Sequence, residues 1–227
     1  GAGGGVAGIV AGLGVVGGLR HLLDDPAAYG YNWDAHVFVD DADRAEPLAN
    51  CSPARADVVH DRAFAAVADV CSGPLEVEGY ATNGVGLTDL VGHVAPTLLA
   101  GRAAAGPREV ALGRRTMEVL GVEFGDRVRI AGPNGERTYR VTGRVVMPVL
   151  ARGDTAQGDV QAVDDGAMFT GEGLQPLLDD DETPAGLLVR WRPGADLDAA
   201  RARFAADPAG VQAPYGPVRP LEVSPLD

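Results

Sequence analysis

The chain has 227 residues, 46% of them hydrophobic and 22% charged, so it is long enough for one large domain or two small ones with a buried core. Glycine and proline together make up about a fifth of the residues, below the share at which low-complexity disorder is expected. Thirty-two acidic residues stand against 19 arginines and no lysine, and the net charge of −13 argues against binding of nucleic acid or anionic lipid through a basic surface.

The first 18 residues contain nine glycines and no charged or polar side chain. A water-exposed helix of this composition is unstable, because each glycine costs about 1 kcal/mol relative to alanine. In a membrane, small residues spaced by four, here Gly4, Gly8 and Gly12, let another helix approach closely. Eighteen residues rise about 27 Å, slightly less than a hydrocarbon core of about 30 Å. We expect residues 1–24 to be the remnant of a transmembrane helix and its stalk, with a flexible glycine-rich leader as the alternative.

Aromatic residues follow this segment. An Asp-Asp-Pro sequence at 24–26 ends the helical pattern, and Tyr29, Tyr31 and Trp33 come directly after it. Amphipathic rings of this kind are typical of a membrane–water interface, so these three residues are candidates for such a contact. Their alternate spacing fits a strand that enters a hydrophobic core equally well, and both interpretations stay open.

Residues 25–80 are expected to form the first half of a domain. Predicted strands cover residues 37–39, 65–71 and 75–80, and a predicted helix runs from Pro53 to about Ala63. A Ser-Gly-Pro sequence at 72–74 separates the second strand from the third. This order of elements predicts a β-α-β unit.

Residues 81–165 carry the clearest local pattern. A short helix is expected over Arg114–Leu120, ended by Gly121, and alternating strands over 127–130 and 138–147 flank a Pro-Asn-Gly turn at 133–135. The alternation directs one set of side chains inward: Val128, Ile130, Tyr139, Val141, Val145 and Met147. It directs another set outward: Arg127, Arg129, Arg140 and Arg144. These arginines form either a solvated face or a face that contacts an acidic partner, such as another copy of this chain.

Residues 166–227 are predicted to form a second unit that matches the first. A strand over 186–191 precedes a helix that starts near Asp196 and stops before Pro208. Leu197, Ala200 and Phe204 mark one face of that helix. A last strand is expected within residues 211–223, a stretch interrupted by prolines.

The motifs of enzymes and metal sites are missing from the sequence. None of the three serines lies in a G-x-S-x-G motif, and the glycines of residues 1–18 lack the lysine of a phosphate-binding loop. The four histidines lack the i, i+4 spacing of paired metal ligands, and the acidic run 179–182 lacks the ligand spacing of an EF-hand. We expect no catalytic residue, no cofactor and no metal, and therefore no enzyme.

Cys51 and Cys71 are the only cysteines, too few for a four-ligand zinc site. An even number in a domain outside the cytoplasm favours one disulfide between them. Such a bond would close a loop of about 20 residues and stabilise the fold by roughly 3 kcal/mol. Two free buried thiols are the alternative.

Several segments share a consistent order with one known family. They are residues 22–34, 98–102 (Leu-Leu-Ala-Gly-Arg), 108–113 (Arg-Glu-Val-Ala-Leu-Gly), 120–122, 125–128 (Gly-Asp-Arg-Val) and 141–148. Taken together, these segments resemble the extracytoplasmic domain of FtsX-like and MacB-like ABC transporter permeases, in the form common in actinobacteria.

The resemblance implies an α+β fold: a porter-like domain of two β-α-β units, with an inserted smaller β-rich subdomain, preceded by the end of a transmembrane helix. It implies a permease of the cell membrane whose domain lies outside the cytoplasm, with a separate cytoplasmic ATP-binding subunit as partner. The implied role is non-catalytic. The domain would relay ATP-driven movement or engage a substrate, a second permease copy or a periplasmic protein.

Two other functions compete with this interpretation. A secreted or membrane-anchored binding module for a peptide, lipid or glycan would come from a gene that ends near residue 227. A cell-envelope hydrolase would need a nucleophile and a base that the sequence does not offer. A permease instead predicts a full membrane span that begins before residue 1 and three or more membrane helices after residue 227.

Overall fold

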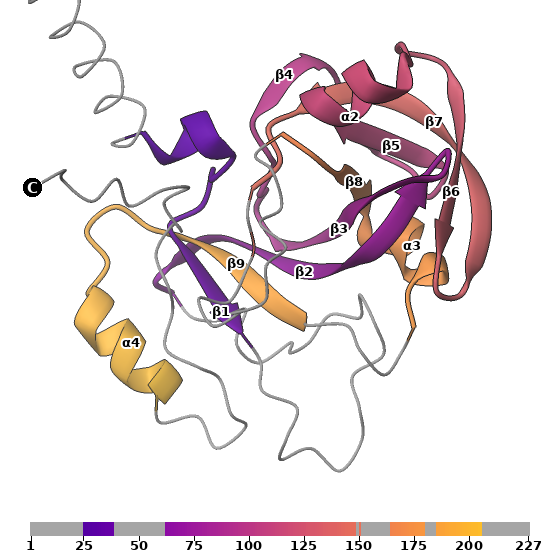
Figure 1. Cartoon of the computed structure of the whole chain (residues 1–227). Helices are drawn as coiled ribbons and strands as arrows, with labels where there is room; N and C mark the ends of the chain where they lie inside the picture. Colours follow the sequence, from indigo (N-terminus) through magenta and orange to yellow (C-terminus); the bar gives the residue numbers. More distant parts are fainter. Residues whose placement is uncertain (1–24, 39–61, 149, 151–163, 180–184, 206–227) are drawn as a thin grey trace, which may run out of the picture.

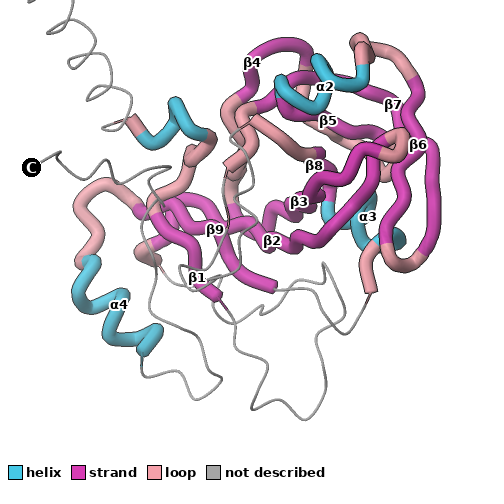
Figure 2. Tube along the Cα trace, in the orientation of Figure 1, coloured by secondary structure: helices cyan, strands magenta, loops and turns pink. Residues whose placement is uncertain are grey.

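The computed structural model describes residues 25–38, 62–148, 150, 164–179 and 185–205. Within these ranges strands dominate and short helices lie at the periphery (Figures 1 and 2). A mixed, sheet-dominated α+β fold is therefore confirmed. In chain order the elements are η1 (Pro26–Tyr29), β1 (Ala35–Phe38), β2 (Phe64–Val77), β3 (Tyr80–Val91), β4 (Leu98–Gly101), β5 (Glu109–Gly113), α2 (Arg114–Leu120), β6 (Arg127–Gly132), β7 (Gly135–Val145), β8 (Ala167–Thr170), α3 (Gly171–Leu174), η3 (Gln175–Leu177), β9 (Ala185–Trp191) and α4 (Leu197–Ala205).

The nine described strands belong to one hydrogen-bonded sheet, which runs in the order β1-β9-β2-β3-β8-β5-β7-β4. β6 lies off this path and pairs with both β2 and β7. Six strands therefore close into a ring, β2-β3-β8-β5-β7-β6, which forms a small β-barrel. β9 and then β1 extend the sheet away from the barrel along the first half of β2 (Figure 1).

β2 and β3 belong to both parts of this fold. Residues 64–71 of β2 pair with β9, whereas Glu76 and Val77 at its end pair with β6. β3 pairs with β2 from one end to the other. Two consecutive residues with positive φ, Glu78 at 48° and Gly79 at 80°, form the turn between them, as a type I′ hairpin requires.

The continuity of β2 corrects one prediction. The sequence predicts two strands broken at residues 72–74, but a single strand passes through them. Counted from the turn, Pro74 pairs with Asn83 at a position where a backbone N–H would point away from β3, so the missing donor costs no ladder bond. On the outer side, residues 72–75 have no strand partner in the described part of the chain, because the pairing with β9 ends at Cys71.

Three clusters of buried apolar side chains hold the parts together. One fills the barrel and includes Tyr139 and Phe169, whose rings meet edge to face at 5.1 Å. A second joins the barrel strands β5, β7 and β8 to β2, β9 and the segment before β1. The third lies on the opposite face of β2 and β9 and consists of Phe64, Val67, Leu187 and Val189.

The predicted hairpin of the central region is confirmed. β6 and β7 pair antiparallel on either side of Pro133 and Asn134. All six side chains predicted to point inward are buried. Arg127, Arg129 and Arg140 are exposed as predicted, whereas Arg144 is half-buried.

The predicted helices and strand near the hairpin and in the second unit are also found. α2 covers the predicted residues and ends at Gly121, whose φ is 64°. β9 matches the predicted strand to within one residue. α4 begins at Leu197, where the side chain of Asp196 accepts a hydrogen bond from the backbone N–H of Ala199 at 2.9 Å. Ala200 on its predicted inner face is buried.

Other predicted elements lie outside the described residues. They are the membrane segment at 1–24, most of the helix at 53–63 and the strand within 211–223. Arg62 and Ala63, at the end of that helix, form a turn. None of the helices within the described ranges is long and apolar enough to cross a bilayer. The two β-α-β units and the boundaries between domains stay predictions.

Candidate functional site

The described part of the chain begins with Asp25 and η1, and contacts with the rest of the body hold this N-terminal junction in place. Asp25 caps η1 by accepting a hydrogen bond from the backbone N–H of Ala27 at 3.1 Å. The carbonyl oxygen of Ala27 accepts a hydrogen bond from the hydroxyl of Thr97 at 2.6 Å. Gly30 has a φ of 95° and lies so close to residues 146–148 that an added Cβ would come within 2.9 Å of their backbone. The junction is thus fixed to the segment before β4 and to the residues that follow β7.

The aromatic residues after η1 lie inside the protein. Tyr31 and Trp33 are each only 4% exposed, and their ring centroids are 5.0 Å apart. Both belong to the cluster that joins the barrel to β9. Of the two interpretations left open by the sequence, entry into a core is the one observed, and these two rings are not placed for contact with lipid headgroups. The side chain of Tyr29 lies outside the described residues.

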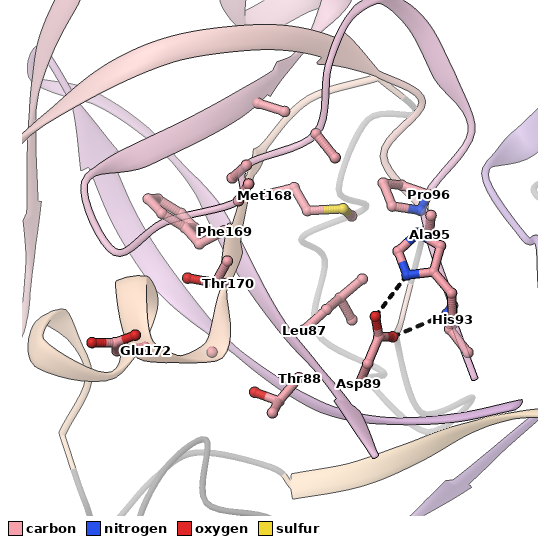
Figure 3. Close-up of a pocket in the computed structure, with 16 residues that line it drawn as sticks. Leu87, Thr88, Asp89, His93, Ala95, Pro96, Met168, Phe169, Thr170 and Glu172 are labelled. Carbon is pink, nitrogen blue, oxygen red and sulfur yellow. Dashed lines mark hydrogen bonds and ion pairs between the residues drawn. The ribbon is translucent and has the colours of Figure 1, made fainter. Parts of the chain in front are cut away.

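A pocket of about 430 Å³ opens between β3, β8 and the segments on either side of β4. Leu87 and Met168 point into it from β3 and β8, and Pro96 borders it on another side (Figure 3). Val94 and the three consecutive alanines at 103–105 add to a lining that is mostly apolar. This size and lining are typical of a site for a small organic ligand.

Asp89 holds one wall of the pocket. Its carboxylate accepts a hydrogen bond from the backbone N–H of Val94 at 3.0 Å and lies 2.6 Å from Nδ1 of His93 (Figure 3). The Asp89 side chain is 39% exposed and that of His93 is 73% exposed, so both groups stand at the mouth of the pocket. The carboxylate therefore fixes the start of the segment before β4 and also offers negative charge to the pocket.

Glu109 holds another part of the pocket lining, the alanine segment at 103–105. It accepts hydrogen bonds from the guanidinium of Arg102 and, at 3.0 Å, from the backbone N–H of Ala105. Because these donors favour the ionised carboxylate, they lower the pKa of Glu109 to about 2. The segment after β4 is thus tied to the start of β5 by a group that stays charged at neutral pH.

The arginines of the predicted partner face differ in their surroundings. Arg129 forms a salt bridge with Glu78 at 3.2 Å, and its backbone N–H lowers the pKa of that carboxyl. Arg127 and Arg140 lie directly opposite each other on β6 and β7, and neither forms an ion pair within the described ranges. The Nε of Arg144 is buried and has no hydrogen-bond partner among the described residues. Whether this face contacts a partner stays a prediction.

Cys71 lies on β2, at the end of the pairing between β2 and β9. It is buried and takes part in a disulfide. Cys51, the other cysteine of the chain, lies outside the described residues. The Cys51–Cys71 pairing therefore stays a prediction.

Two buried ionisable residues were not identified from the sequence. Asp69 on β2 is 3% exposed, and its Oδ1 is buried without a hydrogen-bond partner in the described part of the structure. Burial raises the pKa of this carboxyl to about 7. Burial also lowers the pKa of His36 on β1 to about 4. Asp69 interrupts the apolar stretch 64–71, and that interruption is the sequence feature that could have identified it.

Asp165 joins β3, α2 and the start of β8 through hydrogen bonds and forms a hub between them. Its carboxylate accepts hydrogen bonds from the hydroxyls of Tyr80 at 2.8 Å, Thr82 at 3.1 Å and Thr116 at 2.8 Å. Thr116 in turn accepts one from the backbone N–H of Gly166 at 2.9 Å. The hub is structural. No group of three or more His, Cys, Asp or Glu side chains that could hold a metal ion is found among the residues described.

A comparison with models of known protein families agrees with the motif resemblance. The family model of the MacB-like periplasmic core domain matches residues 2–207. Among solved structures, the chain is similar to a domain from a Porphyromonas gingivalis protein that is assigned as a permease, with 15% identity and a TM-score of 0.44 over 82% of this chain and 90% of that one. No curated protein matches the sequence.

Proposed function

Because the chain belongs to the family of MacB-like periplasmic core domains, we propose that it acts as the extracytoplasmic domain of an FtsX-like ABC transporter permease and relays ATP-driven movement there. The family match over residues 2–207 is the observation that carries this proposal. In this role the domain is not an enzyme. ATP is hydrolysed by a separate cytoplasmic subunit, and the domain moves in response.

The continuity of the sheet supports a role in transmitting movement. β2 has 14 residues, which corresponds to roughly 45 Å of extended strand, and it runs from the β1–β9 part into the barrel. β3 lies beside it from Val67 to Val77. A hinge between the two parts would have to break the pairing of β2 with β3. The packed layers on either side also resist continuous deformation. Displacement of one part is therefore passed to the other.

The N-terminal junction supports the same role. Residues 25–33 are fixed to the body by the contact of Thr97 with Ala27 and by the close approach at Gly30. A membrane helix formed by residues 1–24 would thus pull on the body through a firm attachment. The proposal includes that helix, two porter-like β-α-β halves and an inserted β-rich subdomain. Its partners would be the membrane, the ATP-binding subunit and a second permease copy or a periplasmic protein.

A binding function is the second candidate, and the pocket beside Asp89 is the observation that favours it. The same pocket would serve a permease that engages a substrate or a secreted or anchored module for a peptide, lipid or glycan. The length of the natural gene separates the two, since only the permease requires several membrane helices after residue 227.

The relay can be tested in the full-length protein, reconstituted with its ATP-binding subunit. A spin label at Glu136→Cys, on the exposed β6–β7 hairpin, reports its distance from a label on the cytoplasmic subunit. We expect this distance to change on ATP binding. A six-residue Gly-Ser insertion between Asp24 and Asp25 should abolish the change while ATP hydrolysis continues.

The same insertion between Pro193 and Gly194 is the control, because this exposed turn lies between β9 and α4, away from the junction. This control variant should behave like the wild type. An unchanged distance response after the insertion at residue 25, or no response in the wild type, contradicts the relay.

A further inference from the structure

We propose that the pocket beside Asp89 binds a small amphiphilic cation, with an apolar body against Leu87 and Met168 and an ammonium or guanidinium group at the Asp89 carboxylate. This inference does not depend on export. It concerns binding to the folded body and holds for a permease and for a binding module alike.

The interior of the pocket suits an apolar group. Leu87 and Met168 point into it (Figure 3). Val94 and Ala111 are also among its lining residues. Met168, Val94 and Ala111 belong to the buried cluster that joins the barrel to β9, and Leu87 packs against that cluster. Those three side chains are already buried, so the apolar surface that a ligand would remove from water is that of Leu87 and of the alanines at 103–105. Removal of such surface from water is the main driving force for binding in sites of this kind.

The mouth of the pocket suits a positive charge. Asp89 and Glu172 are exposed carboxylates among the lining residues, and no arginine lines the pocket. Each carboxylate oxygen has two lone pairs, so Asp89 can accept a further hydrogen bond while it holds Val94 and His93. The net charge of −13 adds a field that attracts cations and repels anions. An anionic ligand would meet this field, and His93 is the only lining residue with a basic side chain.

The walls are held in place before a ligand arrives. Asp89 ties down the segment before β4, and Glu109 ties down the segment after it through Arg102 and Ala105. A pocket whose walls are already fixed loses less entropy on binding than one that must be ordered by its ligand. The carboxylate that contacts the cation is also the one that orders its wall, so its position at the mouth is defined.

The test compares three probes with the same apolar body: 4-phenylbutylamine, 4-phenylbutanol and 4-phenylbutanoate. Each is titrated to millimolar concentration into the ¹⁵N-labelled chain of 227 residues, and amide chemical shifts are followed by NMR. We expect the amine to bind most tightly and the carboxylate least. Shifts should concentrate in residues 87–96, 103–105 and 168–172. Equal affinity for the alcohol and the amine, or shifts elsewhere in the chain, overturns the proposal.

Asp89→Asn removes the charge and keeps an oxygen that can accept the hydrogen bond from Val94. It should weaken amine binding about fivefold, the factor expected for one charge pair in a watery setting, and leave the alcohol unaffected. Asp126→Asn is the matched control, because Asp126 also accepts a backbone hydrogen bond, from Glu123 at 2.9 Å, but does not line the pocket. If both variants change amine binding equally, the proposal fails.

Glu172→Gln gives an independent check, because within the described ranges this exposed side chain forms no hydrogen bond to a loop of the kind that Asp89 forms. It should weaken amine binding less than Asp89→Asn does and leave the spectrum of the free protein intact. A larger effect at Glu172 than at Asp89 would place the cation elsewhere and overturn the assignment.

Discussion

Replacement of Asp69 by asparagine should remove a pH-dependent loss of stability that this buried carboxyl imposes on the fold. In the folded chain the pKa of Asp69 is raised to about 7 by burial, against 3.8 for the free group. Between these values the folded state keeps the proton and the unfolded state releases it. Stability from this group is therefore fully present below pH 3.8 and is lost as the pH rises towards 7.

The size of the effect follows from the same values. Each pKa unit corresponds to about 1.4 kcal/mol, so a shift of about three units costs about 4 kcal/mol at and above pH 7. His36 acts in the opposite sense, because its pKa falls from 6.5 to about 4 and its contribution is lost as the pH falls through this range. Between pH 4 and 6.5 the changes in stability with pH that Asp69 and His36 cause have opposite signs and largely cancel. Measurements on the wild type alone therefore cannot separate them.

The assay is urea unfolding from pH 4 to 8, followed by the fluorescence of Trp33 and Trp191. The free energy of unfolding of Asp69→Asn minus that of the wild type should grow by about 4 kcal/mol between pH 4 and 7 and then stay level. In the variant alone, stability should rise with pH up to about 6.5, because the His36 contribution is no longer offset. A difference between variant and wild type that does not change with pH refutes the reasoning.

Three further predictions concern stability. Gly30→Ala should lower the free energy of unfolding by about 1–3 kcal/mol more than Gly79→Ala does, the order of magnitude of stored backbone strain. Both glycines have positive φ, but only at Gly30 would an added Cβ lie 2.9 Å from backbone atoms. Equal losses in urea unfolding would show that the junction relaxes freely. Asp165→Asn should lower the free energy of unfolding by about 2–4 kcal/mol, because up to three hydroxyl donors lose a charged acceptor, and a loss below 0.5 kcal/mol would contradict the hub. The unreduced protein should show no free thiol by mass spectrometry, and reduction of a Cys51–Cys71 bond should cost about 3 kcal/mol; two alkylated cysteines without reductant would exclude that bond.

Elements whose determinants are close together in the sequence could be predicted. The β6–β7 hairpin follows from alternation around a short turn, and α2 follows from a helical stretch that ends at Gly121. Both are set by residues within a few positions of each other. The same reasoning failed at Pro74. Proline interrupts a strand only where a neighbouring strand would need a backbone N–H donor at that position, and proline has none. That information lies in β3 and β9, not in the local sequence.

The candidate site could be predicted only in fragments. Asp89 and His93 are four residues apart, but the pocket between them and Met168 exists only because β3 and β8 become neighbours in the sheet. The hub at Asp165 likewise draws its donors from segments around residues 80 and 116. The closure of the barrel depends on the short pairing of Val77 with Ile130 and its neighbours. No local pattern encodes such contacts, so composition and spacing alone could not reveal them.

The position of β1 in the sheet determines when this part of the fold can form. β1 pairs only with β9 among the described strands, and Ala35 and its partner Val189 are separated by about 150 residues of chain. During synthesis from the N-terminus, β1 therefore appears long before its partner exists. Contacts between residues so distant in the sequence slow folding. Until β9 is synthesised, the unpaired backbone groups of β1 can form non-native hydrogen bonds with other strands. The barrel can assemble once residue 178 has emerged, because Leu174, Leu177 and Leu178 belong to its core. β9 is synthesised later and inserts between β1 and β2.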